Sequence, residues 1–300
     1  SMCACWTGKT PSALAPLRIV VVAMGCCKSK GLLDVREASV PVSSDVIAGK
    51  VAQAKTTRVL ALRECALSRL PPAALEGDVA SGLRTADLAA NALRTLPPEI
   101  GAWSNLRNLL CSQNQLTELP SSLGWLGNLE KAVLSNNQLQ ALPSELSQLG
   151  KLKALQLDSN RLGPQLLPSI FFGPVAGVLE ELDLSNNVLE ELPSSLSELK
   201  QLTRLCVQSN RLKVLPDSLG QLSKLQYLDA ADNSLRSVPP SLLTGTNLSE
   251  LWLKGNPMDR LQLQQLPGFN NFLERRKQRI DAKIQSQVVG AIDLTVCGLE

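Results

Sequence analysis

Residues 106–120 read LRNLLCSQNQLTELP, and residues 129–143 read LEKAVLSNNQLQALP. Both follow the pattern LxxLxLxxNxLxxLP, with Ala or Cys at an occasional apolar position, and a third copy, LRTADLAANALRTLP, occupies residues 83–97. The asparagine of the pattern recurs along the chain at Asn91, Asn114, Asn137, Asn160, Asn187, Asn210, Asn233 and Asn256. Successive asparagines are 23 residues apart, except for one interval of 27. A constant period of this length is typical of stacked structural repeats.

The pattern predicts the local structure of each unit. Its LxL core favours a short β-strand whose alternate residues point inward and outward. The asparagine amide can then satisfy backbone groups of neighbouring units that would otherwise be buried without a hydrogen bond. The LP step begins a convex segment of short helices or 3₁₀ turns. Because one unit cannot bury its own leucines, the units must stack in line. The sequence therefore predicts an α/β solenoid (a horseshoe) with a parallel concave sheet, about nine 23-residue units and helical caps.

The expected boundaries follow from the repeats. The repeats should span residues 57–260, with Cys65 in the asparagine position of a degenerate first unit. The longer interval reflects four extra residues within 163–177, which should bulge on the convex side or the rim. Capping helices are expected over residues 44–56, starting near Ser44, and over residues 261–286. The remaining residues, 1–43 and 287–300, are expected to form tails, the first of them flexible.

The C-terminal capping helix should be amphipathic. Its apolar stripe consists of Phe269, Phe272, Leu273, Ile280 and Ile284. Its basic residues are expected largely on the solvated side, and they are Arg275, Arg276, Lys277 and Arg279. The sequence favours a solvated cap, with contact to an anionic membrane as the alternative.

Composition restricts the possible functions. The chain is 44% hydrophobic but only 3% aromatic, so its core must be aliphatic. It has 30 basic and 27 acidic residues, and the excess of three is already present in residues 273–283, so we expect no nucleic-acid partner. The chain has no histidine, which excludes His-dependent triads and His metal sites. We expect no catalytic residue, no metal, no cofactor and no small-molecule substrate.

The eight cysteines indicate a reducing environment. They form no CxxC pair and no cluster at either end of the repeats, as disulfide-capped extracellular repeats usually have. We therefore expect a cytoplasmic protein. Cys65 and Cys111 occupy inward positions and should be inert core thiols, whereas Cys206 is outward and should be open to modification. The six-residue apolar run at 19–24 is far too short to cross a bilayer.

A short motif near the N-terminus suggests a lipid anchor. Residues 24–29, MGCCKS, fit the N-myristoylation pattern M-G-x-x-x-[ST], with Gly25 as acceptor if translation starts at Met24. Cys26 and Cys27 are candidates for palmitoylation, and a second lipid would make membrane attachment stable. The prediction is therefore lipidation within residues 24–30 and possible contact with a membrane surface. A chance match in a tail is the alternative.

The outward strand positions form the predicted binding face. One row reads Thr85, Asn108, Lys131, Ala154, Glu181, Arg204, Tyr227 and Glu250. The second row reads Asp87, Leu110, Val133, Gln156, Asp183, Cys206, Asp229 and Trp252. Three patches are expected: apolar Leu110 with Val133, an acidic centre, and an aromatic–arginine cluster. The acidic centre is formed by Glu180, Glu181 and Asp183, and the cluster by Arg204, Cys206, Tyr227 and Trp252. Aromatic and arginine side chains dominate binding hot spots; the alternative is that these residues are merely tolerated in a strand.

These uniform LPxxL-type units resemble the intracellular Ras-group class of leucine-rich repeats. The early MGCC and the closing PGFNNFLERRK at 267–277 are similar to the leucine-rich repeat-containing protein 57 group and its plant and algal relatives. The resemblance implies a non-enzymatic scaffold or adaptor that binds a protein partner on the concave face. The alternatives are a regulatory subunit that docks on and controls a GTPase or phosphatase, and a thiol enzyme acting through Cys206.

Overall fold

The computed structural model describes residues 42–164, 173–285 and 297. The chain divides into two compact units, residues 1–38 and residues 39–300, and every described residue belongs to the second. The lipidation candidates Gly25, Cys26 and Cys27 lie outside the described residues, as do most of the predicted insertion and all of the predicted C-terminal tail except Cys297.

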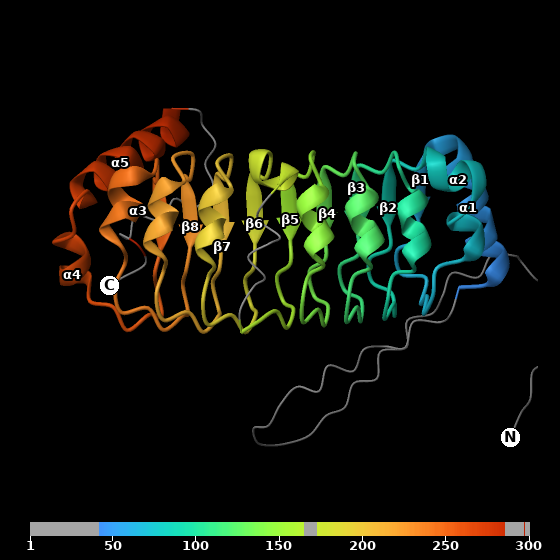
Figure 1. Ribbon diagram of the computed structural model, residues 1–300, viewed down its shortest axis with the longest axis horizontal. Coiled ribbons are helices and arrows are strands. Elements are labelled where there is room, and N and C mark those ends of the chain that lie inside the picture. The colour runs from blue at the N-terminus through green and yellow to red at the C-terminus, as the bar shows by residue number, and fades with distance from the viewer. Residues whose placement is uncertain (1–41, 165–172, 286–296, 298–300) are drawn as a thin grey trace, which may run out of the picture. The chain divides into compact units, whose positions relative to one another are not determined.

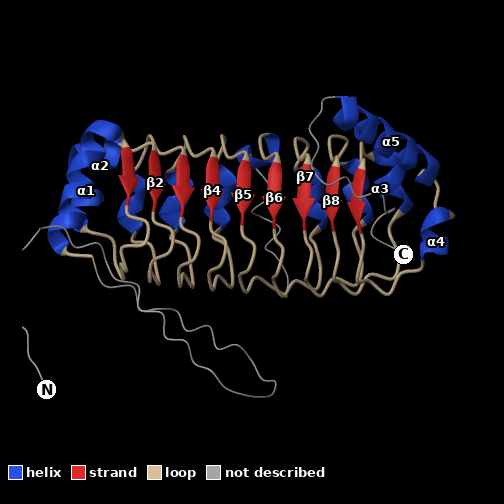
Figure 2. Ribbon diagram, turned by 180° about the vertical axis from the view of Figure 1, so that it is seen from behind, coloured by secondary structure: helices blue, strands red, loops and turns tan. Residues whose placement is uncertain are grey.

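Nine strands of the described residues form one open parallel sheet in chain order, β1 to β9 (Figure 2). The strands are β1 (Val59–Ala61), β2 (Thr85–Asp87), β3 (Asn108–Leu110), β4 (Lys131–Val133), β5 (Ala154–Gln156), β6 (Glu181–Asp183), β7 (Arg204–Cys206), β8 (Tyr227–Asp229) and β9 (Glu250–Trp252). Each strand is three residues long and pairs with the next without a shift in register. This arrangement confirms the predicted α/β repeat solenoid.

Short helices form the second layer of the same unit, on the other side of the strands (Figure 1). Most are single 3₁₀ turns that begin immediately after the LP step, where the proline lies in extended conformation. They are η1 (Pro72–Ala74), η2 (Pro98–Ala102), η3 (Ser121–Trp125), η4 (Ser144–Gln148), η6 (Pro174–Gly177), η7 (Ser194–Glu198) and η8 (Asp217–Gln221). Longer turns form α2 (Gly77–Gly82) and α3 (Pro240–Gly245). Because proline at a helix start has no amide hydrogen that needs a partner, the LP step fits these beginnings.

The core lies between the two layers. The middle residue of every strand is at most 4% exposed, and these residues are Leu60, Ala86, Leu109, Ala132, Leu155, Leu182, Leu205, Leu228 and Leu251. The leucines of the helical turns, such as Leu146 and Leu196, meet them from the other side. Cys65 and Cys111 are buried as expected, and burial raises the pKa of the Cys111 thiol.

The repeated asparagines connect consecutive units through their side chains. Asn137 is typical: its Nδ2 donates to the carbonyls of Cys111 (3.0 Å) and Leu134 (2.9 Å), and its Oδ1 accepts from the amide of Leu116 (3.0 Å). Asn256 makes the corresponding bonds at the last strand. One side chain thus satisfies backbone groups of its own and the preceding unit, which explains why asparagine recurs at this position.

Helices cover both ends of the repeats. At the N-terminal end α1 (Ser44–Thr57) packs Val51 and Ala54 against the first unit, and Lys50 Nζ lies 3.2 Å from Cys65 Sγ. At the C-terminal end, α4 (Arg260–Gln264) precedes α5 (Phe269–Gln285), whose Phe269 and Phe272 are buried. None of the helices in the described part of the chain is long and apolar enough to span a membrane.

The basic residues of α5 correct the expectation that they are largely solvated. Arg275 donates from Nε to the carbonyl of Leu248 (2.8 Å) and from Nη2 to that of Leu243 (2.9 Å). Arg276 is only 8% exposed, whereas Lys277 is exposed as predicted. The last unit has no following unit, and Arg275 bonds two of its carbonyls instead.

The apolar stripe of α5 is also shorter than predicted. Its first residues, Phe269 and Phe272, fill the end of the core, and Leu273 and Ile280 are half-buried. Ile284, in contrast, is 58% exposed. The expected packing of this stripe is therefore wrong at its C-terminal end.

Candidate protein-binding face of the sheet

The outward residues of the nine strands form a continuous surface, which we call the sheet face. The strand register places Glu181, Arg204, Tyr227 and Glu250 in one line across β6 to β9. A parallel line contains Asp183, Cys206, Asp229 and Trp252. Neighbouring strands lie about 4.8 Å apart, so side chains on adjacent strands are within contact range.

Arg204 and Tyr227 form the best-defined contact on the sheet face. The guanidinium carbon of Arg204 lies 3.7 Å from the centroid of the Tyr227 ring, a cation–π geometry that holds both side chains in place. The Tyr227 hydroxyl lies 3.4 Å from Asp229 Oδ2. Burial and the neighbouring Asp229 carboxylate raise the pKa of Tyr227 to about 12. The hydroxyl therefore stays protonated at neutral pH and can donate a hydrogen bond.

Cys206 corrects the prediction of an accessible outward thiol. Its strand position is outward, but the side chain is only 5% exposed. Burial and the Asp183 carboxylate raise its pKa to about 12. Because the thiolate is the reactive form, this cysteine is unreactive at neutral pH and gives no support to a thiol enzyme. Alternation along the strand predicted its direction, but not that neighbouring side chains would cover it.

The outward aspartates have a local role that sequence reasoning missed. Asp87, Asp183 and Asp229 each accept, through Oδ1, the amide of the residue two positions later, at 3.2, 3.0 and 3.1 Å. The side chain thereby fixes the turn that follows the strand. The same position in three units, each time with a small residue two places on, was the signal that could have revealed it.

The predicted acidic centre divides in two. Glu180 pairs with Lys153 of the preceding unit, with 3.2 Å between Nζ and Oε1. Glu181 and Asp183 form no ion pair within the described residues, although Arg204 lies directly beside Glu181 in the register. The Arg204 guanidinium is stacked on Tyr227 instead. The two carboxylates consequently border a hollow of about 30 Å³, lined also by Leu155, Gln156, Leu182, Arg204 and Cys206.

Leu110 and Val133 lie side by side on β3 and β4 and are half-buried. They form a small apolar patch several strands away from the Arg204–Tyr227 contact. The structure therefore separates the predicted binding residues into two groups, one on β3 and β4 and one on β6 to β9.

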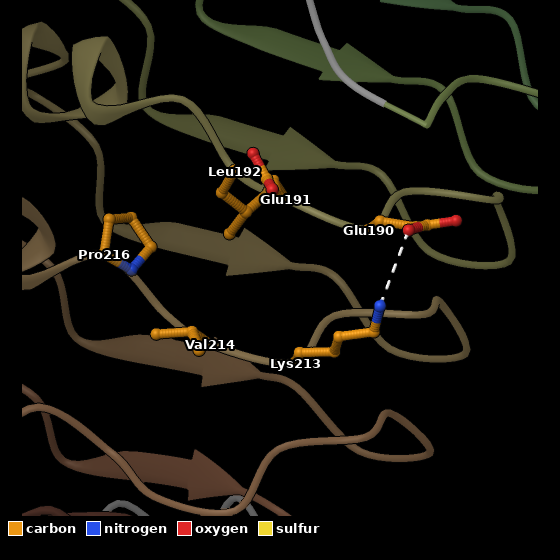
Figure 3. Close-up of a pocket in the computed structure, with 6 residues that line it drawn as sticks. All are labelled: Glu190, Glu191, Leu192, Lys213, Val214 and Pro216. Carbon is orange, nitrogen blue, oxygen red and sulfur yellow. Dashed lines mark ion pairs between the residues drawn. The ribbon is translucent and has the colours of Figure 1, made fainter.

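A larger hollow, which the sequence did not reveal, lies outside the sheet face. Its lining residues are Glu190, Glu191, Leu192, Lys213, Val214 and Pro216, and its volume is about 350 Å³. Figure 3 shows Lys213 directed at Glu190 across its border, with 3.7 Å between Nζ and Oε2. Val214 is 65% exposed. The hollow is open and mostly apolar, and it contains no nucleophile.

The described residues contain no group of three Cys, Asp or Glu side chains that could hold a metal ion. The contacts seen on the sheet face are the stack of Arg204 on Tyr227 and the hydrogen bonds of Asp183 and Asp229.

Comparisons with known proteins agree with this geometry. Leucine-rich-repeat signatures match residues 178–199 and residues 200–258. The chain has a leucine-rich-repeat fold. No curated protein is significantly similar to it in sequence.

Solved leucine-rich-repeat structures resemble the chain over most of its length. A leucine-rich-repeat protein of Leptospira interrogans is 29% identical over 76% of this chain and 61% of its own, with a TM-score of 0.64. YopM of Yersinia enterocolitica is 26% identical over 71% of this chain and 42% of its own, with a TM-score of 0.56. The plant peptide hormone receptor RGFR1, in complex with RGF2, is 27% identical over 67% of this chain and 36% of its own, with a TM-score of 0.50. The chain thus spans less than two thirds of each of these proteins.

Proposed function

We propose that this protein is a non-enzymatic scaffold or adaptor that binds a protein partner on the sheet face. The observation that carries the proposal is the Arg204–Tyr227 stack beside Trp252, a combination of side chains that dominates binding hot spots. The plant receptor among the similar structures binds a peptide hormone. Its likeness to this chain supports a peptide or protein as the ligand.

Partner capture by matched variants tests the proposal. Tyr227→Ala combined with Trp252→Ala removes both aromatic side chains from outward positions, so the core leucines stay in place. We expect this double variant to lose proteins that the wild type retains, with unchanged circular dichroism. Gln148→Ala, on the exposed side of η4, is the control and should retain them. Equal capture by the double variant and the wild type would move the binding site to another surface, such as the residue 163–177 insertion.

We further propose the Ras-group class for the repeats and membrane attachment through acylation. The regular LPxxL-type units and the MGCCKS motif support this assignment. Protein expressed from Met24 in a eukaryotic cell should carry a myristoyl group on Gly25 and distribute to membranes, with palmitoylation of Cys26 and Cys27 strengthening attachment. Intact-mass spectrometry and fractionation measure this, with Gly25→Ala as control. An unmodified mass and a soluble distribution in both proteins would leave an adaptor without a lipid anchor.

Control of a GTPase or phosphatase is a second candidate that uses the same surface. The carboxylates Glu181 and Asp183, which lack ion-pair partners within the described residues, would suit a basic surface on such an enzyme. The two candidates differ in what co-purifies with the protein. Hydrolytic activity towards GTP or a phosphoester in the captured fraction, lost in the Tyr227→Ala/Trp252→Ala variant, would favour the regulatory subunit over a passive adaptor.

A further inference from the structure

We infer that the part of the sheet face on β6 to β9 binds an extended basic segment of the partner, with lysine or arginine side chains facing the strands. The inference rests on the proposed function, because it specifies the chemistry of the partner at the same surface. Its basis is the uneven distribution of charge along the sheet face and the hollow between Glu181 and Asp183.

Charge on the sheet face changes between its two halves. The eight outward positions of β2 to β5 include one carboxylate, Asp87, and one ammonium group, Lys131. The eight of β6 to β9 include one guanidinium and four carboxylates, which belong to Glu181, Asp183, Asp229 and Glu250. Complementary charge steers a partner and fixes its register, so the second half favours a cationic ligand.

Several carboxylates of the repeats are neutralised by ion pairs within the molecule. Glu130, Glu180, Glu190 and Glu250 are paired with Arg107, Lys153, Lys213 and Arg279, at distances of 2.9 to 3.7 Å. In contrast, Glu181, Asp183 and Asp229 form no ion pair with any described residue, and the nearby Arg204 is held on Tyr227. A positive charge from outside the chain would complete this arrangement.

The hollow between Glu181 and Asp183 matches a small cationic group. Its volume of about 30 Å³ is that of one water molecule or one ammonium group. Arg204 also lines the hollow, and its guanidinium is stacked on the Tyr227 ring. Two carboxylates and one guanidinium therefore border the hollow, which leaves a net negative charge around it.

A second cation fits beside Trp252. Asp229 and Trp252 are direct neighbours in the register, so an aromatic residue and a carboxylate that forms no ion pair with any described residue lie on adjacent strands. Cations bind favourably to such combinations. This position lies two to three strands from the hollow, about 12 Å at the usual strand spacing. A peptide in extended conformation that lies across the strands advances about 3.4 Å per residue, and its side chains point alternately towards and away from the sheet face. Two basic side chains that reach both positions must therefore be four residues apart in the peptide.

Selection from a displayed library of random nonapeptides tests the inference without knowledge of the partner. Peptides selected on the wild type should be enriched in lysine or arginine, with two basic residues four positions apart. A synthetic selected peptide should bind at least ten-fold more weakly to Glu181→Gln/Asp183→Asn. Asparagine keeps the oxygen that accepts the Ser185 amide (3.0 Å), so the turn is preserved. Glu99→Gln/Glu145→Gln on η2 and η4 removes the same charge elsewhere and should leave affinity unchanged.

Three results would overturn the inference: selected peptides without basic enrichment, undiminished binding to Glu181→Gln/Asp183→Asn, or equal loss in the Glu99→Gln/Glu145→Gln control. The outcome is distinct from that of the proposed function. If peptides lacking basic residues bind the wild type but not Tyr227→Ala/Trp252→Ala, the sheet face is a binding site and only its basic specificity is wrong. If basic peptides behave as expected while natural partners still bind the aromatic variant, the proposed function fails instead.

Discussion

The inward and outward sides of the strands follow different rules. In β7, Leu205 is completely buried, whereas the preceding residue, Arg204, projects to the sheet face. The inward position is leucine or alanine in all nine described strands, while the outward positions range from Lys131 to Trp252. Packing restricts the inward side to aliphatic side chains. Outward side chains such as Glu181 are not restricted by the packing of the core, so they can differ in size and charge from one strand to the next.

Removing a core leucine should show the largest difference between the two sides. Leu205→Ala leaves a cavity between the sheet and the helical turns, and we expect it to lower the free energy of unfolding by about 2–5 kcal/mol. Arg204→Ala removes a cation–π contact at the surface and leaves the core packed, so its effect should be about 1 kcal/mol or less. Urea titration followed by circular dichroism measures both. Equal losses for the adjacent residues would contradict the distinction between a packed side and a free side.

The asparagine series tests the same contrast with a polar side chain. Asn137→Leu leaves the Leu116 amide without its partner and removes one of the two side-chain hydrogen bonds to the Cys111 carbonyl, the other being donated by Asn114. It should lower the free energy of unfolding by about 1–3 kcal/mol. Asn256→Leu should have a smaller effect, because this asparagine is only half-buried and lies at the last strand. Melting temperatures provide the measurement. If Asn137→Leu has the same melting temperature as the wild type, the hydrogen bonds between units contribute nothing to stability.

The repeats were predictable because their determinants are local. The interval between asparagines and the alternation of leucines determine where the strand and the turn of each unit lie, and which residues pair between strands. Stacking of the units follows because each unit has an apolar side that it can bury only against its neighbours. The outward rows were predictable for the same reason. Whether an outward residue is accessible was not, because that depends on side chains from other units. Cys206 shows this, since its strand position is outward and its thiol is buried.

The C-terminal cap was predicted less well because its contacts are distant in sequence. A run of four basic residues among five usually marks a solvated surface. Arg275 instead reaches carbonyls 27 and 32 residues earlier, which no local pattern reveals. The signal that could have found it is physical: the last unit of a solenoid has backbone groups without a following unit, and a basic helix placed there can supply donors.

Replacing Arg275 should have an intermediate effect on stability. It compares a bonded and an exposed basic residue of α5 at the end of the solenoid. Arg275→Met keeps much of the aliphatic chain but removes the two hydrogen bonds to the Leu243 and Leu248 carbonyls, so we expect a loss of about 1–2 kcal/mol. Lys277→Met, on the exposed side of α5, is the matched control and should change stability by less than about 0.5 kcal/mol. Urea titration should therefore separate the two. Indistinguishable variants would mean that the basic run is solvated, as the sequence suggested.

Replacing Asp229 should have the smallest effect on the free energy of unfolding, and it should raise that free energy instead of lowering it. Burial raises its pKa above the ordinary value, more than the Ala231 amide and the Tyr227 hydroxyl lower it. The folded state then binds a proton more readily than the unfolded state, so the ionised carboxylate disfavours folding at neutral pH. Asp229→Asn keeps an oxygen for the Ala231 amide without the charge, and should raise stability at pH 7 by less than about 0.5 kcal/mol.

The pH dependence and a second variant identify the cause of this gain. As the pH falls through the raised pKa towards the ordinary value near 4, the carboxyl becomes protonated in both states, so the gain in the asparagine variant should disappear. Asp229→Ala also removes the charge, but it loses the bond to the Ala231 amide at 3.1 Å and should therefore be less stable than the asparagine variant at every pH. Melting temperatures between pH 4 and pH 7 measure all three proteins. A gain that persists at low pH would show that charge is not its origin, and a loss at pH 7 would show that the sheet face needs this carboxylate for folding and not for a partner.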